Sequence, residues 1–198
     1  LFPMGGAIWS MPQSGMQDFP AESFVSFCNN HFLLSRNRPR WRTVSGGSRE
    51  YVKKLTAPFA QSIRTQSRVV RVGNQDGKVL VQDAGGHRAL FDHVIIAAHG
   101  DQALRMLEAP GQTECDILGH IHYAPNIAYV HRDESLMPRL RKVWSSWNYM
   151  SQDDSNNRLS VSYWMNRLQN IDPTRPLFIT LNPVTPPKPE LTFAVLDY

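Results

Sequence analysis

The sequence lacks the short motifs that identify many common enzyme classes. It contains no G-x-S-x-G, no H-E-x-x-H, no C-x-x-C and no Walker lysine loop. These absences argue against an α/β-hydrolase, a zinc protease, a thiol oxidoreductase and a P-loop NTPase. There are only two cysteines, Cys28 and Cys115, too few for a disulfide framework or a cysteine zinc site. Such sparse usage is typical of a reducing compartment, so we expect a cytoplasmic protein.

Long apolar runs and a strong charge imbalance are absent as well. The longest apolar run, residues 94–98, is far shorter than the roughly 20 residues that span a bilayer. The net charge is +4, and the basic residues are scattered apart from clusters at residues 36–42 and 139–142. A solvated surface is the simpler interpretation of these clusters. We therefore expect no nucleic-acid partner and no transmembrane segment, although the charge allows peripheral membrane contact.

The composition that remains is that of an ordinary globular protein, with 41% hydrophobic and 19% charged residues. The chain begins without a methionine and stops shortly after a proline-rich stretch. We therefore expect a piece of a longer protein.

Residues 68–107 carry the strongest structural pattern. Two strand-like segments, residues 68–72 and 78–82, are joined by an Asp-Gly turn, and a third follows a Gly-Gly pair. Residues 92–101 are then nearly all apolar, end in small residues and open a helix. This pattern is typical of a parallel strand buried between helices, with room for a ligand at its carboxyl end. It predicts a nucleotide-cofactor site in a chain that lacks the usual glycine fingerprint.

Two amphipathic helices are predicted before this region, whereas residues 1–17 show no periodicity and are expected to form a loop. Residues 20–34 repeat apolar side chains at helical spacing, with Cys28 on the apolar face. A second helix follows Gly46 and Gly47. A glycine pair can let the backbone approach an anion, but more often it only turns the chain.

Three strand-like segments, residues 126–132, 142–149 and 159–165, dominate the second half. A polar turn at residues 152–158 separates the last two. Consecutive antiparallel strands would form one sheet with a large aromatic face. Such a face either packs as core or lines a cavity for an apolar substrate, and spacing alone favours core.

The histidines give no clear catalytic or metal site. His120 and His122 would share one side of a strand, but no third ligand is implied, so we expect no metal. His131, Asp133 and Glu134 have the pattern of a polar strand end. Without a catalytic constellation, a cofactor that carries the difficult chemistry is the favoured hypothesis.

Short motifs spread over most of the chain carry a family resemblance. They lie at residues 3–10, 27–33, 46–52, 69–72, 91–99, 128–133, 144–149 and 163–166. Their order and spacing resemble the flavin-containing amine oxidase superfamily, which includes protoporphyrinogen oxidases and phytoene-type desaturases. The likeness is greatest to bacterial proteins described as predicted NAD/FAD-binding amine oxidases.

The resemblance implies an α+β fold of α/β origin, in which a substrate domain interrupts a Rossmann-like FAD domain. It assigns residues 1–60 to the helical part of the substrate domain, with a return to the FAD domain near residues 45–60. Residues 61–108 become a partial FAD domain with a β-meander and a buried strand. Residues 109–198 become a mixed, largely antiparallel substrate-binding sheet flanked by helices.

The resemblance also assigns site residues, with FAD as the cofactor and no metal. The candidates for cofactor binding are Val69, Ala97, Ala98, Gly46 and Gly47. The candidates for the substrate cavity are Trp144, Trp147, Tyr149, Tyr163, Trp164 and Asn126. No catalytic residue is identified.

Two departures from the family pattern limit the prediction. No G-x-G-x-x-G and no glycine-rich FAD segment at the C-terminal end are present, so we expect this chain to bind FAD weakly or not at all. The family's lysine on the first substrate-domain strand is missing at residues 125–128. The implied reaction is hydride removal from an amine or an apolar substrate, with desaturation left open.

Two rival hypotheses are a non-catalytic hydrophobic-ligand or lipid-binding domain and a basic interaction module at residues 36–42.

Overall fold

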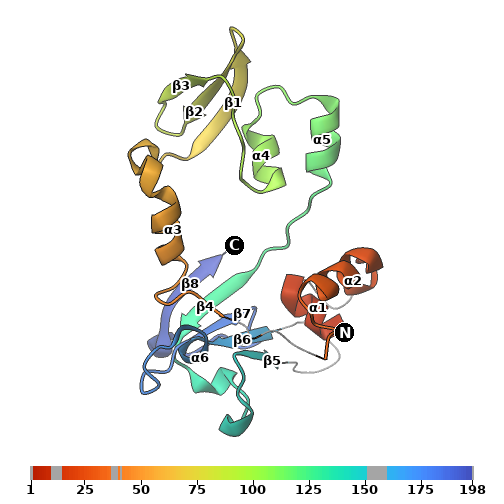
Figure 1. Ribbon diagram of the computed structural model, residues 1–198, viewed down its shortest axis with the longest axis vertical. Coiled ribbons are helices and arrows are strands. Elements are labelled where there is room, and N and C mark those ends of the chain that lie inside the picture. The colour runs from red at the N-terminus through yellow and green to blue at the C-terminus, as the bar shows by residue number, and fades with distance from the viewer. Residues whose placement is uncertain (1, 10–14, 37–39, 41, 151–159, 198) are drawn as a thin grey trace. The chain divides into compact units, whose positions relative to one another are not determined.

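A computed structural model describes residues 2–9, 15–36, 40, 42–150 and 160–197 (Figure 1). The chain divides into two compact units, which are described separately. The sheet unit comprises Leu1–Leu55 and Ala124–Tyr198, and the meander unit comprises Thr56–Tyr123. Helices combined with antiparallel sheets confirm the expected α+β class.

The meander unit is built on three antiparallel strands, β1 (Val69–Gln75), β2 (Lys78–Asp83) and β3 (Arg88–Phe91), in the order β1-β2-β3. The β1–β2 turn has Asp76 at φ 51° and Gly77 at φ 76°. Both central residues of a tight hairpin turn need positive φ, which an Asp-Gly pair adopts readily. The hairpin and the third strand are therefore confirmed.

Short helices complete this unit: η2 (Ala57–Ser62), α4 (Gly100–Met106) and α5 (Gln112–Gly119). After α4 the chain joins β1 through a parallel bridge between Val72 and Leu107, and the Glu108 amide donates to the Val72 carbonyl at 2.9 Å. The buried apolar residues of the unit are Val72, Leu80 and Ala103.

The predicted buried strand within residues 92–101 is wrong. Between β3 and α4 the chain forms no strand, no strand of the described residues pairs with it, and Ile95 is 93% exposed. An apolar run supplies side chains for burial, but a strand also needs a neighbouring backbone to pair with its N–H and C=O groups. The described part of the chain offers none here.

The sheet unit contains five strands: β4 (Ile127–His131), β5 (Trp147–Met150), β6 (Ser160–Trp164), β7 (Phe178–Leu181) and β8 (Thr192–Asp197). They form one antiparallel sheet in the order β5-β6-β7-β4-β8. The three predicted strands lie in one antiparallel sheet, as expected, although the second begins only at Trp147. β5 and β6 are neighbours, whereas β7 lies between β6 and β4. The predicted turn at residues 152–158 lies outside the described residues.

The helices of this unit are α1 (Phe2–Trp9), η1 (Gly15–Gln17), α2 (Ala21–Asn30) and α6 (Met165–Gln169), and α3 (Arg49–Thr56) runs to the end of the unit. The expected loop at residues 1–17 is therefore wrong for α1. Trp9 packs against Phe19, Phe24 and Phe27 with ring centroids 4.6–5.8 Å apart, so tertiary contact favours the helix. The thiol of Cys28 is free and buried in α2, as expected. None of the described helices is long and apolar enough to cross a membrane.

Candidate functional site

The five-stranded sheet has two faces that differ in character. Successive side chains of a strand point to opposite faces, so the strand register assigns each residue. We define the covered face by residues that lie opposite one another across the strands: His131, Asn148, Ser162, Trp164, Phe178 and Thr180. We define the aromatic face by their neighbours on the other side: Ala128, Val130, Trp147, Tyr149, Val161, Tyr163, Ile179 and Leu181.

The covered face holds the core of the unit. Phe178 is fully buried, and Met137 and Trp144 pack with it. The Trp144 ring meets Phe178 and Trp164 edge-on at centroid distances of 5.7 and 5.3 Å. Such edge-to-face pairs add to the stability that apolar burial provides. The connection between β4 and β5 supplies Met137 and Trp144, so it covers this face of the sheet.

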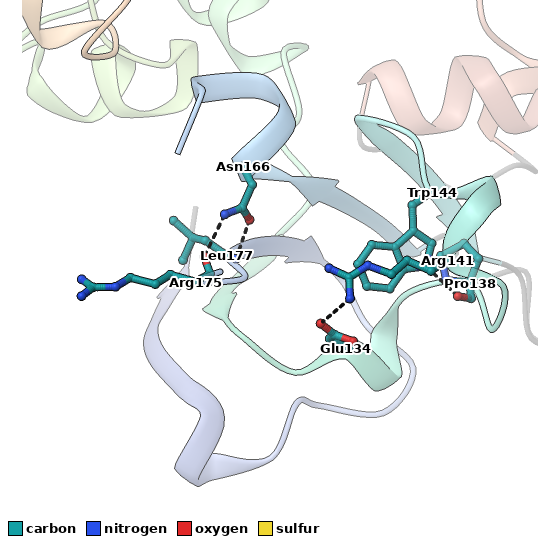
Figure 2. A network of polar contacts seen from close by, with 7 residues as sticks. All are labelled: Glu134, Pro138, Arg141, Trp144, Asn166, Arg175 and Leu177. Atoms are coloured by element: carbon teal, nitrogen blue, oxygen red, sulfur yellow. Dashed lines mark hydrogen bonds and ion pairs between the residues drawn. The ribbon is translucent and has the colours of Figure 1, made fainter. Parts of the chain in front are cut away.

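Polar contacts hold that connection in place (Figure 2). The Trp144 indole Nε1 donates to the Pro138 carbonyl at 2.8 Å. The Arg141 guanidinium lies 5.1 Å from the centroid of the Trp144 ring and 4.0 Å from the Glu134 carboxylate. The connection contains two short helical turns, η3 (Glu134–Leu136) and η4 (Arg141–Val143).

Asn166 fixes the loop that leads into β7 (Figure 2). Its Nδ2 donates to the carbonyls of Asp172 and Arg175, each at 2.8 Å, and its Oδ1 accepts from the Leu177 amide at 2.8 Å. Asn166 is buried, so these bonds satisfy groups that would otherwise lose their water partners. The loop thereby places Phe178 opposite Trp164 of β6.

The aromatic face is the more exposed side. Trp147 and Tyr163 form a cross-strand pair with their rings 5.5 Å apart at 73°. Trp147 is 52% exposed and Tyr149 39%, while Val161 beside them is buried. Cross-strand aromatic packing restricts ring rotation. The result is a supported aromatic surface of the kind that binds flat or apolar molecules.

The six predicted cavity residues therefore fall into three places. Trp144 and Trp164 belong to the covered core, and Trp147, Tyr149 and Tyr163 share the aromatic face. Asn126 lies just before β4, where its Oδ1 accepts from Asn182 Nδ2 at 2.7 Å, and Asn182 Oδ1 in turn accepts from the Ile127 amide. A role in substrate binding stays a prediction for all six.

The predicted cofactor residues occur in both units, and each unit is considered by itself. Gly46 and Gly47 have φ of 85° and 87° just before α3, and the space where a Cβ of Gly47 would lie is open. Ala97 and Ala98 are exposed in the segment before α4, and Val69 begins β1 opposite Asp83. Small side chains and positive φ leave the backbone accessible, as a dinucleotide phosphate requires. Within each unit these positions leave room for a phosphate near the backbone, except that the Glu50 side chain lies against Gly46. Their role in cofactor binding stays a prediction.

Sequence reasoning missed two features near the β4 end. A cavity of about 210 Å³ is lined by Asp133, Ser135, Leu136, Met150, Ser160, Lys188 and residues 183–186. Two of its lining residues, Asp133 and Leu136, bond to His131 and Ser162, and Thr180 lies between these two, in contact with both. His131, Ser162 and Thr180 come from different strands, so only the sheet register brings them together. The described residues contain no cluster of three or more His, Cys, Asp or Glu that could hold a metal ion.

Burial and hydrogen bonding shift two pKa values here. Burial raises the pKa of Asp133, but hydrogen bonds from the Lys188 amide and from Ser135 outweigh it and hold the pKa below its usual value. Burial lowers the pKa of His131, and the nearby Asp133 charge only partly opposes this effect. At neutral pH the site thus holds an ionised Asp133 and a neutral His131.

Comparisons with known proteins address the family. A sequence model of the flavin containing amine oxidoreductases matches residues 10–167. A search of curated proteins finds no match. Solved structures give 22 matching chains. Among them is a CLA-producing fatty acid isomerase from P. acnes, 15% identical with a TM-score of 0.46, over 72% of this chain and 32% of that one. This chain thus spans about a third of that enzyme's length.

Because the family match covers most of the sequence, the resemblance is confirmed, and the protein belongs to the flavin-containing amine oxidoreductase family.

Proposed function

We propose that the intact protein is an FAD-dependent oxidoreductase that removes a hydride from an amine or an apolar substrate. Family membership supports the reaction class. The observation that carries the substrate class is the aromatic face, where Trp147 and Tyr149 stay exposed on a sheet whose opposite side buries Phe178. A surface of this kind discriminates by shape and by contact with apolar groups.

FAD is the proposed cofactor, and Gly46, Gly47, Ala97, Ala98 and Val69 are the proposed contacts. The exposed backbone at these positions is suited to hold phosphate and adenosine groups. When bound, the flavin would supply the electron acceptor for the broken C–H bond. Residues 94–98, which form no buried strand, do not support the cofactor site, so the support for FAD comes from the family match.

The side chains of the aromatic face would bind and orient the substrate. The edge-on packing of Trp147 and Tyr163 holds both rings in fixed positions, so a substrate meets a preorganised surface. Ring faces attract alkyl chains, and they also attract ammonium groups through cation–π contact. The surface is thus compatible with either an amine or an unsaturated lipid. Its apolar residues would also exclude water from the reacting bond.

The test is anaerobic reduction of the flavin by candidate donors. The protein, purified with FAD, is mixed with a series of amines and, separately, with unsaturated fatty acids, and flavin absorbance is followed. We expect bleaching by at least one hydrophobic donor and none by small polar alcohols. A flavin that no hydrophobic donor reduces would contradict the proposal.

A second candidate, a non-catalytic domain that binds a hydrophobic ligand, is favoured by the same exposed aromatic face. It differs in one measurable respect, because it predicts ligand binding with no redox change. Equal quenching of Trp147 fluorescence by a fatty acid with and without FAD, together with no bleaching, would favour this alternative. Of the rival basic module at residues 36–42, Arg36, Arg40 and Arg42 are described and exposed, and residues 37–39 and 41 lie outside the described residues.

A further inference from the structure

A buried polar chain runs across the covered face and returns to the turn from which it starts. The Asp133 amide donates to His131 Nδ1 at 3.1 Å, and His131 Nε2 lies 2.7 Å from Thr180 Oγ1. Thr180 Oγ1 lies 2.7 Å from Ser162 Oγ, which donates to the Leu136 carbonyl at 3.0 Å. The side chains of His131, Thr180 and Ser162 are fully buried.

The two ends of this chain fix the direction of every bond in it. A backbone N–H can only donate, so His131 Nδ1 must accept and a neutral ring carries its proton on Nε2. A carbonyl can only accept, so the Ser162 hydroxyl donates to Leu136. Thr180 then accepts from His131 and donates to Ser162. Each donor meets one acceptor, and no arrangement with a proton on Nδ1 preserves the chain.

We propose that this chain is an acid-sensitive lock on the turn formed by residues 133–136. A proton added to His131 Nδ1 would set two N–H donors against each other and break the bond from the Asp133 amide. The ring and the turn could then no longer keep their present positions. Because Asp133, Ser135 and Leu136 line the cavity of about 210 Å³, release of the turn would also remodel that cavity.

Burial has the largest effect on the His131 ring and disfavours its charged form, although the Asp133 carboxylate and a backbone hydrogen bond with Asp133 favour that form. Asp133 is the charged group that acts on the ring, but its Oδ1 already accepts from the Ser135 amide and its Oδ2 from the Lys188 amide, both at 3.0 Å. Among the described residues, β7 and β6 place uncharged side chains next to the ring: Phe178, Thr180 and, through Thr180, Ser162. Burial by itself disfavours the charged form of the ring, so no neighbouring Lys or Arg is needed to keep His131 neutral.

The sign of the pH effect follows from this geometry. Burial lowers the pKa of His131, so the unfolded chain takes up a proton near pH 6.5 while the folded protein does not. Stability is therefore complete above about pH 6.5 and is lost as the pH falls toward the folded-state pKa. One linked proton changes the unfolding equilibrium constant by up to about tenfold per pH unit.

The direct test is NMR of the full chain with ¹⁵N-labelled histidine. We expect His131 as the Nε2–H tautomer at pH 7, and still neutral below pH 6.5, where a histidine of the unfolded chain becomes charged. On further acidification the Ser135 amide should exchange faster, after correction for the intrinsic pH dependence, while the Tyr129 amide on β4 should not. An Nδ1–H tautomer, a His131 that takes up its proton at or above pH 6.5, or unchanged Ser135 exchange once His131 is charged would each overturn the proposal.

Urea unfolding at stepped pH gives the energetic counterpart. His131→Gln should remove the His131 share of the pH dependence between pH 6.5 and 5, whereas His122→Gln should keep it. Equal pH slopes for the wild type and a folded His131→Gln would contradict the lock. If His131→Gln does not fold, the isosteric Thr180→Val tests the same chain. It should destabilise the protein and expose the Ser135 amide at pH 7, and unchanged exchange there would count against the proposal.

Discussion

The two units of this protein both contain an antiparallel sheet, but the two sheets differ in how much of one face is buried. In the sheet unit, the connection between β4 and β5 covers one face and buries Phe178 completely. In the meander unit, Leu80 is buried on β2, but Leu90 and Phe91 on β3 are nearly half exposed. Strand pairing alone therefore does not create a core. A covering segment does, and it leaves the opposite face of the larger sheet available for a ligand.

The comparison predicts that core substitutions cost most in the sheet unit. Phe178→Ala removes a fully buried ring from contact with Trp144, which should lower the free energy of unfolding by about 4 kcal/mol. Urea unfolding followed by tryptophan fluorescence measures the effect. The control Phe193→Ala, at a position 62% exposed on β8, should change it by less than about 0.5 kcal/mol. Similar losses for both variants would mean that the covered face is not the core.

Loss of the three Asn166 hydrogen bonds should have the next largest effect on stability. Asn166→Ala leaves the Leu177 amide and two carbonyls without their partner, at a cost of about 2–3 kcal/mol. Asn29→Ala, at an exposed site on α2, is the matched control and should be nearly neutral. A neutral Asn166→Ala would show that the loop before β7 does not depend on this side chain.

The meander unit should respond more weakly to a core truncation. Leu80→Ala should destabilise it by about 2 kcal/mol, because the site is buried but thinly covered. Leu90→Ala, on the neighbouring strand and 46% exposed, should cost less than about 1 kcal/mol. Hydrogen exchange of the β1 and β2 amides reports this unit alone. A cost for Leu80→Ala as large as that for Phe178→Ala would remove the contrast between the units.

The smallest effect concerns the hairpin turn. Gly77→Ala places a side chain at φ 76° with no neighbouring atom within 4 Å, so its cost is conformational only, about 1 kcal/mol. Gly85→Ala in the next turn is the control, because its φ is not in the positive range. The same hydrogen-exchange measurement compares them. Equal effects would show that positive φ at Gly77 does not limit the hairpin.

Features set by neighbouring residues in the sequence could be predicted. The Asp76–Gly77 hairpin, the third strand of the meander and the helix around Cys28 depend on turn chemistry and local periodicity. Features that depend on residues far apart in the sequence could not be predicted. Helix α1 depends on aromatic contacts with α2, and residues 94–98 lack the paired strand that their composition predicted.

The candidate site was predicted in composition but not in arrangement. Trp144 precedes β5 outside any strand, so alternation gave no information about its face, whereas the register pairs Trp147 with Tyr163. The strand order places β7 between β6 and β4, which brings Thr180 between Ser162 and His131. No local sequence pattern predicts this strand order, because the order follows from the packing of the whole sheet.

The central claim is that the aromatic face binds substrate while the covered face maintains the fold. The most direct test is the substrate dependence of anaerobic flavin reduction in the FAD-loaded Trp147→Ala variant, with its urea midpoint measured in parallel. We predict a rise of roughly tenfold in the substrate concentration for half-maximal reduction, which corresponds to the loss of about 1.4 kcal/mol of aromatic contact, with the fold intact. Reduction that is unchanged from the wild type in a folded Trp147→Ala protein would contradict the claim.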